Sequence, residues 1–314
     1  MPFERARAVL ERLGGIGLSV SSLWRRMACW GERFAALETC QREAALALPR
    51  RGVPLPGEAV VPDKRMGVAM DGAMVPLRTE GWKELKIGCV FEVVTRDRWD
   101  ASRAEWEATA HGVHNSFVAH LGGPEVFGAL VWSEACRRGW EQARDRQVMG
   151  DAAAWVWNLA AQHFYDSRQV VDWYHATHHL ALAAQLWHGE GSAAAQRWYQ
   201  QRVLALYQGH AARIGAELCQ AARTHPTAGE ALQREGNYFC NNHRRMQYLE
   251  LREEGFVIGS GMVESGCKQF RARFCGPGMR WSRAGIERLI PVRAAILSNR
   301  FETVWSMVYH PPPN

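Results

Sequence analysis

The order of apolar segments between residues 66 and 172 constrains the fold of this chain more than any other feature. Three strand-like runs come first, and they are followed by helix, strand, helix and strand, each bounded by turn residues. The segments are 66–77, 85–94, 116–121, 124–138, 146–150, 152–164 and 169–172. The sequence therefore predicts an α/β protein built on a mixed five-stranded sheet.

This order also predicts how the strands connect. An antiparallel three-stranded unit followed by parallel strands with crossover helices is the arrangement of a ribonuclease H-like core. We therefore expect residues 66–172 to form the first part of such a core.

The chain becomes wholly helical after residue 172. Apolar residues recur at helical spacing, for example at Leu180, Ala183 and Trp187. We expect an all-helical insertion over 173–255. A last helix beginning near Met262 and a basic C-terminal part should occupy 256–305.

A small helical segment is expected at 1–48, before the core. A Gly14-Gly15 break separates two helical stretches, and Ser19 stands where it would cap the second one. Arg25 and Arg26 fall in the first turns of that helix, so the outline fits a DNA-binding helix-turn-helix or, alternatively, a plain helical hairpin. Proline and glycine enrichment then predicts a linker over 49–65.

Composition excludes some classes of protein. The 314 residues are 47% hydrophobic, which is enough for a packed core, yet no apolar run approaches the roughly 18 residues of a membrane span. The start of the chain carries charges in place of an apolar signal segment. These features predict a cytoplasmic protein with no membrane partner.

The eight cysteines are scattered and form no CxxC pair, which favours reduced, mostly buried thiols. A zinc site is the alternative. It would use Cys240 and His243, with Cys219 and His225 upstream.

Positive charge is concentrated near the C-terminus. The chain has a net charge of +6, and the segment 265–300 alone holds eight basic residues and one acidic residue. Aromatic residues interleave with the basic ones, as on surfaces that bind a phosphate backbone; a solvated helix face is the alternative. The candidate DNA-binding residues of this segment are Lys268, Arg271, Arg273, Arg280 and Arg283.

Three acidic residues are candidates for chemistry. Asp71 and Asp151 stand at strand ends beside small residues, and Glu264 falls in the first turn of the last helix. Each has an ordinary alternative role, as a turn former or a helix cap. In a ribonuclease H-like core, however, the three would converge at one sheet edge, where carboxylates can hold two Mg²⁺ ions about 4 Å apart.

Six short motifs, in order, carry a family resemblance. They are DGAMVP at 71–76, GWKELK at 81–86, GDAAAWVWN at 150–158, VDWYH at 171–175, GSGMVES at 259–265 and GMRW at 278–281. With them, the chain resembles bacterial insertion-sequence DDE transposases of the ISKra group and their Lre-type relatives from about Met66 to Arg300.

The resemblance implies a Mg²⁺-dependent DNA transposase, with Mn²⁺ as a substitute ion. It maps the catalytic, metal-binding triad onto Asp71, Asp151 and Glu264. It also implies double-stranded DNA as partner, at transposon ends and target, a homodimer or larger assembly on that DNA, and association with the nucleoid.

Two departures from the family pattern stand out. The second motif commonly reads Gly-Asp-Gly, whereas Ala152 follows Asp151 here. Family members also usually carry a longer N-terminal region, so the chain is expected to be a truncated copy.

A histidine completes the set of candidate catalytic residues. Asp172 and His175 have the Asp-x-x-His spacing seen in related transposases, and His178 and His179 follow one turn later. His175 is expected to orient a scissile phosphate or an attacking water, with an ordinary surface or core histidine as the alternative.

Two other functions remain open at the level of sequence. One is a catalytically defective DNA-binding remnant. The other is a nuclease of the same fold that performs no strand transfer.

Overall fold

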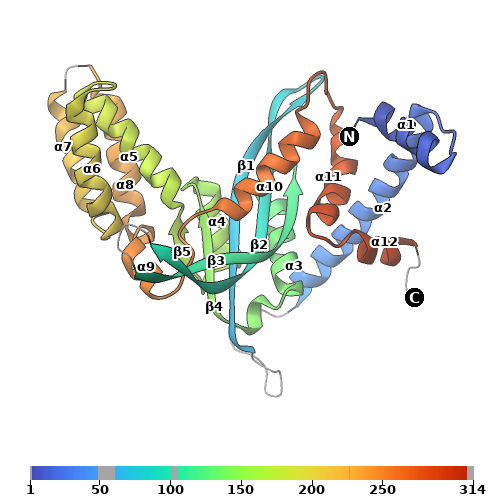
Figure 1. Cartoon of the computed structure of the whole chain (residues 1–314), viewed down its shortest axis with the longest axis horizontal. Coiled ribbons are helices and arrows are strands. Elements are labelled where there is room, and N and C mark those ends of the chain that lie inside the picture. Colours follow the sequence, from blue (N-terminus) through green and yellow to red (C-terminus); the bar gives the residue numbers. More distant parts are fainter. Residues whose placement is uncertain (1, 49–60, 101–104, 226, 310–314) are drawn as a thin grey trace.

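The fold is that of a computed structural model, and residues 2–48, 61–100, 105–225 and 227–309 are described. A mixed five-stranded sheet lies at its centre (Figure 1). Its strands are β1 (Val61–Leu77), β2 (Gly81–Asp100), β3 (Glu105–His120), β4 (Ala143–Gly150) and β5 (Arg168–Val171), in the order β3-β2-β1-β4-β5. The first three strands pair antiparallel, and β4 and β5 continue in parallel from β1. The predicted α/β fold with a mixed five-stranded sheet is confirmed.

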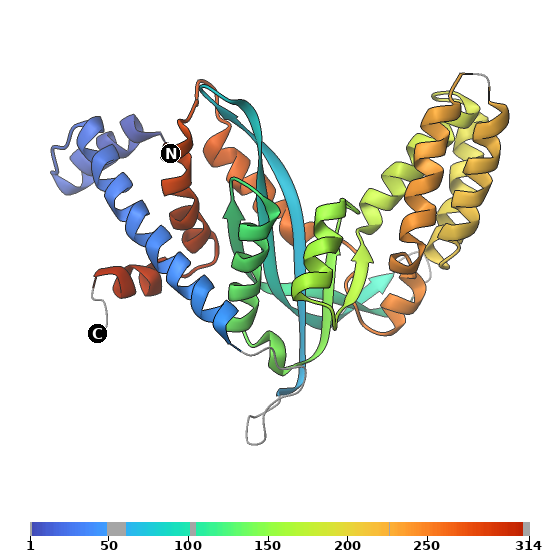
Figure 2. The same cartoon turned by 180° about the vertical axis from the view of Figure 1, so that it is seen from behind.

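Helices cover both faces of the sheet, because side chains alternate along the central strand β1. Met66, Val68 and Met70 belong to the core shared with α3 (Pro124–Arg137) and α4 (Ala154–His163). Ala69, Ala73 and Val75 belong instead to the core shared with α10 (Gly261–Phe274) and α11 (Arg283–Leu297). Figure 2 shows the sheet from the α3 and α4 side.

A run of helices stands beside the sheet, between β5 and α10 (Figure 1). It consists of α5 (Trp173–His188), α6 (Ala193–Tyr207), α7 (Ala211–Thr224), α8 (Gly229–Asn242) and the short α9 (Tyr248–Glu253). Two glycines bring α7 and α8 together: a Cβ on Gly215 would lie 2.8 Å from the Gly236 carbonyl oxygen.

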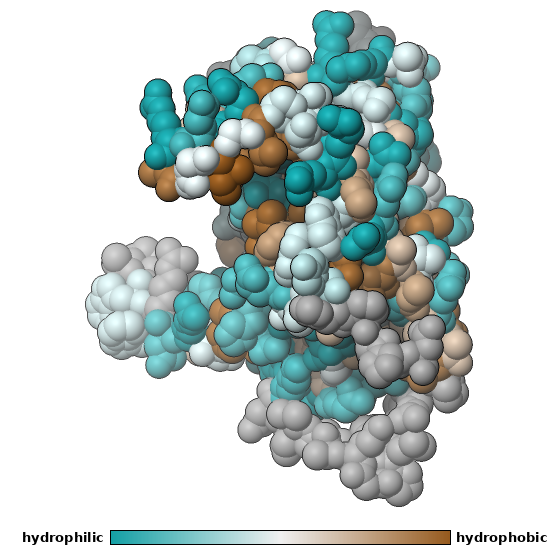
Figure 3. Space-filling view, turned by 90° about the vertical axis from the view of Figure 1, so that its right-hand side faces the viewer, coloured by the Kyte–Doolittle hydropathy of each residue, from teal (hydrophilic) through white to brown (hydrophobic). Residues whose placement is uncertain are grey.

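The N-terminal segment forms α1 (Phe3–Gly14) and α2 (Val20–Ala47). The expected cap of α2 is present, since Ser19 Oγ accepts a hydrogen bond from Ser22 N at 3.1 Å. α2 is 28 residues long and packs along α11 and α3. The short α12 (Phe301–Tyr309) closes on α2 through Trp30 and Trp305, whose ring centroids are 4.2 Å apart. Figure 3 looks onto this end of the molecule, where apolar residues reach the surface between hydrophilic ones.

Several strands are longer than predicted, including β2 and β4, and two of the differences have a clear reason or consequence. β3 begins at Glu105 rather than Ser116, because its outer half pairs with β2 through the backbone and needs no apolar pattern. β1 begins at Val61, within the predicted linker 49–65. Residues 49–60 of that linker lie outside the described residues.

The expectation of mostly buried thiols is wrong. All eight cysteines are free, but only Cys89 and Cys267 are buried. Across the described ranges, the structure contains no helix long and apolar enough to cross a membrane.

Candidate active site

Asp71 and Asp151 lie at neighbouring positions of the sheet. β1 and β4 are parallel, and Met70 pairs in register with Gly150. The two aspartates therefore follow directly after a matched pair of residues. The prediction of a strand end holds for Asp151 but is wrong for Asp71, because β1 continues to Leu77 by pairing with β2. In β1, Asp71 follows the alternation of Ala69 and Ala73, which places it on the face covered by α10.

The Asp71 carboxylate is held from both sides. Its Oδ1 accepts a hydrogen bond from Gly72 N at 2.6 Å, and its Oδ2 accepts one from Cys267 Sγ of α10 at 3.3 Å. Burial raises the pKa of Asp71, and the nearby Asp151 carboxylate adds to this rise against those hydrogen bonds. A cation placed between two such carboxylates would relieve the repulsion.

Asp151 is positioned by a strained turn between β4 and α4. Its Oδ1 accepts a hydrogen bond from Ala153 N at 3.0 Å. Ala152, between them, has φ = 74°, a left-handed conformation that glycine adopts far more easily. A glycine at this position would adopt the same backbone conformation without that strain.

Glu264 lies in the first turn of α10, in a network that includes Asp172. Ser260 Oγ donates to Glu264 Oε1 at 3.4 Å, and Ser260 N donates to Asp172 Oδ1 at 2.7 Å. Lys268 Nζ lies 3.5 Å from Glu264 Oε2 on the other side. Cys267, which bonds Asp71, is one helical turn after Glu264. α10 therefore carries Glu264 itself and, one turn later, the cysteine that bonds Asp71.

Asp172 links the start of α5 to the start of α10 through hydrogen bonds. It caps α5, since its Oδ2 accepts a hydrogen bond from His175 N at 2.9 Å, while its Oδ1 holds Ser260 N. Burial raises its pKa, and Glu264 adds to the rise. With both oxygens occupied by backbone amides, Asp172 positions the helices around the acids.

The donor set suits a hard cation in part. Carboxylate oxygens such as those of Asp71 and Asp151 are the ligands that Mg²⁺ prefers. Among the residues that the structure describes, however, no group of three or more His, Cys, Asp or Glu side chains is arranged to hold a metal ion. Asp71 and Asp151 are close enough to interact electrostatically, but Glu264 does not complete a three-carboxylate site with them in this arrangement.

His175 faces these acids from α5. Burial lowers its pKa and the neighbouring His179 lowers it further, whereas Asp151, Asp172 and Asp71 oppose the shift. The ring centroids of His175 and His179 are 5.0 Å apart. His175 is therefore in electrostatic contact with both candidate aspartates.

Two residues of α8, Glu235 and Tyr238, also belong to the site, although the sequence did not predict them. His179 Nδ1 lies 2.7 Å from Glu235 Oε2, and the His179 ring stacks on Tyr238 at 3.9 Å between centroids. The Tyr238 hydroxyl is buried without a hydrogen-bond partner in the described part of the chain. No local motif marks Glu235 or Tyr238, since only the packing of α8 on α5 brings them to the histidines.

Much of the basic segment is already paired with acids. Four of its eight basic residues form ion pairs: Lys268 with Glu264, Arg283 with Glu80, Arg288 with Glu32 and Arg300 with Glu134. Three of these acids come from elsewhere in the chain. The excess of positive charge counted along the sequence is therefore larger than the excess on the folded surface.

The other candidate DNA-binding residues differ in exposure. Arg271 and Arg280 are exposed, whereas Arg273 is half-buried over the rings of Phe274 and Trp281. Burial lowers the pKa of Arg273, and the nearby Arg293 lowers it further.

The N-terminal candidates lie at the same end as this segment. Arg25 and Arg26 are exposed on α2. The ring of their neighbour Trp24 packs at Gly285, near the start of α11. The N-terminal candidates therefore lie close to Arg283, the first residue of α11.

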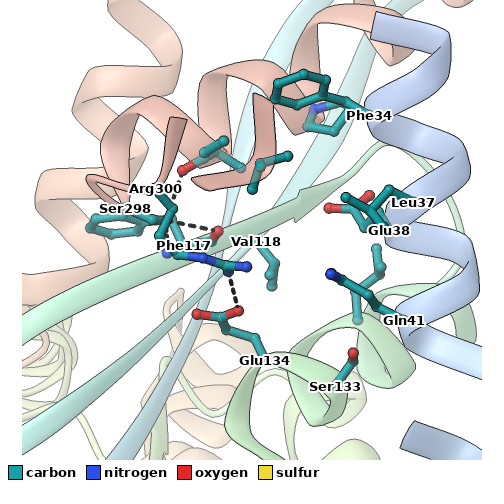
Figure 4. Close-up of a pocket in the computed structure, with 15 residues that line it drawn as sticks. Phe34, Leu37, Glu38, Gln41, Phe117, Val118, Ser133, Glu134, Ser298 and Arg300 are labelled. Atoms are coloured by element: carbon teal, nitrogen blue, oxygen red, sulfur yellow. Dashed lines mark hydrogen bonds and ion pairs between the residues drawn. The ribbon is translucent and has the colours of Figure 1, made fainter. Parts of the chain in front are cut away.

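A separate polar cavity of about 50 Å³ lies between α2, β3 and α3 (Figure 4). Glu38 of α2 points into it opposite Glu134, which pairs with Arg300 at 2.7 Å. Burial raises the pKa of Glu38 to about 7; Arg42 and Arg300 oppose the rise and Glu134 adds to it.

The candidate zinc ligands His225, His243 and Cys219 make hydrogen bonds within the helical region. His225 Nδ1 accepts a hydrogen bond from Ala228 N at 3.0 Å, and His243 Nδ1 lies 2.7 Å from the Cys240 carbonyl oxygen. Cys219 contacts Gln233 and Asn237. These contacts leave no arrangement of zinc ligands among them.

No protein-family model matches the chain, and no curated protein matches it either.

Proposed function

We propose that the protein is a DDE transposase with a ribonuclease H-like catalytic core and a helical insertion. It would hydrolyse a phosphodiester at the ends of an insertion sequence and join the freed 3′-hydroxyl to target DNA. The observation that carries the proposal is that Asp71 and Asp151 each follow a register-matched residue of the parallel strands β1 and β4, beside the helix that bears Glu264.

In this proposal Asp71 and Asp151 hold Mg²⁺ or Mn²⁺, and Glu264 completes the site when DNA is bound. An ion held by these residues would lower the pKa of a bound water and would stabilise charge on the leaving oxygen. His175 orients the scissile phosphate or the attacking water. Arg271 and Arg280, with Arg25 and Arg26, contact the DNA backbone, and a dimer or larger assembly brings two ends together.

The test is cleavage of DNA that carries the element's ends. Asp71→Asn and Asp151→Asn should each lower Mg²⁺-dependent cleavage by about 10³-fold or more, since several kcal/mol of transition-state stabilisation would be lost. Glu190→Gln, at an exposed position between α5 and α6, removes one charge elsewhere and should leave cleavage unchanged.

Undiminished cleavage by either aspartate variant would refute the assignment of the acids. Cleavage without joining to target DNA would identify a nuclease instead. DNA binding without any metal-dependent cleavage by the unmodified protein would identify a DNA-binding remnant.

A further inference from the structure

A large cleft opens beside the candidate acids, on the other side of the segment that leads into α10. It lies between the outer half of the β2/β3 hairpin, the start of α5 and residues 256–261, and it has a volume of about 940 Å³. Arg252 of α9 pairs with Glu107 of β3 at 2.8 Å, which ties the hairpin to the helical region seen in Figure 1. The cleft is far larger than a water or an ion requires, and it lies in the range of pockets that hold organic ligands, roughly 300–1,000 Å³.

Aromatic rings with free faces line this cleft. Tyr174 is 66% exposed, yet its ring edge rests on Gly259, where an added Cβ would lie 3.1 Å from Tyr174 Cε2. Trp99 is 49% exposed and is held edge-on by Trp106 at 5.6 Å between centroids. Trp173 and Tyr207 form a further part of the wall. Rings that are held in place but open to solvent are ready surfaces for stacking.

One side chain that lines the cleft carries a buried acceptor without a hydrogen-bond partner among the described residues. This acceptor is Oδ1 of Asn115. An unpartnered buried acceptor is unfavourable unless an incoming group donates to it. Nucleobases carry N–H donors on the edges that pairing hides in a duplex, and their flat faces stack on aromatic rings.

The wall of the cleft is bonded directly to the acidic network. Trp173 N donates to the Ile258 carbonyl oxygen at 2.9 Å, and Ser260 N donates to Asp172 at 2.7 Å. Ser265, which lines the cleft, follows Glu264 on α10. A strand lying in the cleft would therefore pass within one helical turn of Glu264.

We propose that this cleft binds unpaired nucleotides of the DNA substrate, by stacking bases on Tyr174 and Trp99 while the adjoining phosphate lies at the candidate acids. This inference rests on the proposed function for the identity of the polymer. A fully paired duplex hides its base faces in its own stack, so unpaired nucleotides are the form that fits.

The test uses the full chain, without divalent ions, and a duplex with a single-stranded overhang that contains 2-aminopurine. Stacking quenches the probe's fluorescence. Tyr174→Ala should weaken overhang binding roughly 5- to 100-fold, the effect of losing one base stack, and Trp99→Ala should also weaken it. Tyr174→Phe keeps the ring and should bind normally. Tyr165→Ala removes an exposed tyrosine from the loop before β5 and should have no effect.

The proposal would be overturned if Tyr174→Ala bound the overhang as tightly as the unmodified chain does. It would also be overturned if a blunt duplex bound as tightly as the overhang duplex and depended on Tyr174 in the same way. Its failure is separable from failure of the proposed function. A chain that binds the overhang through Tyr174 but never cleaves DNA would refute the transposase assignment alone. A chain that cleaves DNA while Tyr174→Ala binds the overhang normally would refute the cleft alone.

Discussion

At the scale of single residues, the strained backbone at Ala152 makes a direct prediction. Replacing Ala152 by glycine should raise the free energy of unfolding by about 0.5–1 kcal/mol. The left-handed conformation costs a residue with a Cβ about 1–2 kcal/mol, and the larger chain entropy of unfolded glycine offsets part of that gain. Urea denaturation measures the difference.

The neighbouring Ala153 provides the control, since its φ of −61° suits alanine. Ala153→Gly should lower the free energy of unfolding by a similar amount. Equal destabilisation by both variants would show that Ala152 carries no strain.

A second residue-scale prediction concerns Glu38 in the cavity of Figure 4. Its folded pKa of about 7 exceeds its ordinary value of 4.5, so the folded chain binds the proton more tightly than the unfolded chain. Its contribution to stability is present below pH 4.5 and is lost as pH rises toward 7. Glu38→Gln cannot ionise and should not lose this stability. The free energy of unfolding of the variant minus that of the unmodified chain should therefore be on the order of 3 kcal/mol larger above pH 7 than near pH 4.

Denaturation of both proteins between pH 4 and pH 8 would check this prediction. The charged and titratable groups around Glu38 are Arg42, Glu134 and Arg300. A stability difference that stays constant with pH would mean that Glu38 titrates normally.

At the scale of elements, the crossing of α2 and α11 depends on a glycine. A Cβ on Gly31 would lie 2.1 Å from the Arg288 carbonyl oxygen, and backbone atoms cannot move aside as a flexible side chain can. Gly31→Ala should therefore force the helices apart and lower the free energy of unfolding by about 1–3 kcal/mol.

Gly17→Ala is the matched control, because nothing lies within 4 Å of its added Cβ. It should change stability by no more than about 0.5 kcal/mol. If Gly31→Ala melts at the same temperature as Gly17→Ala, α2 does not pack closely on α11 in solution.

At the scale of the whole molecule, ion pairing decides which basic residues remain available for DNA. Arg280 is exposed, whereas Arg288 pairs with Glu32 at 2.7 Å. If the basic end contacts the DNA backbone, Arg280→Ala should reduce the slope of log K against log salt by about 1. Arg288→Ala should reduce it less, because Arg288 already has an acidic partner.

DNA binding measured across a series of salt concentrations tests this difference. An unchanged slope in Arg280→Ala would remove this residue from the interface. Equal reductions in the two variants would show that the ion pair with Glu32 opens on binding.

The order of strands and helices along the chain was largely predictable, because local sequence patterns mark each of them. Period-two alternation and turn residues mark β1, β4 and β5, and Ser19 marks the start of α2. The outer half of β3 was not predictable, because pairing with β2 stabilises it without an apolar pattern.

The sequence by itself determined the alternation along β1, and with it the face on which Asp71 lies. Only the tertiary structure decided what surrounds that aspartate: Cys267 from α10, Asp151 from the turn after β4, and the histidines and Tyr238 that α5 and α8 bring together. It likewise decided that half of the basic segment is paired with acids. The physical reason is the same in each case. Most of the secondary structure follows from neighbouring residues, whereas electrostatics, burial and the outer half of β3 depend on contacts between residues farther apart in the chain.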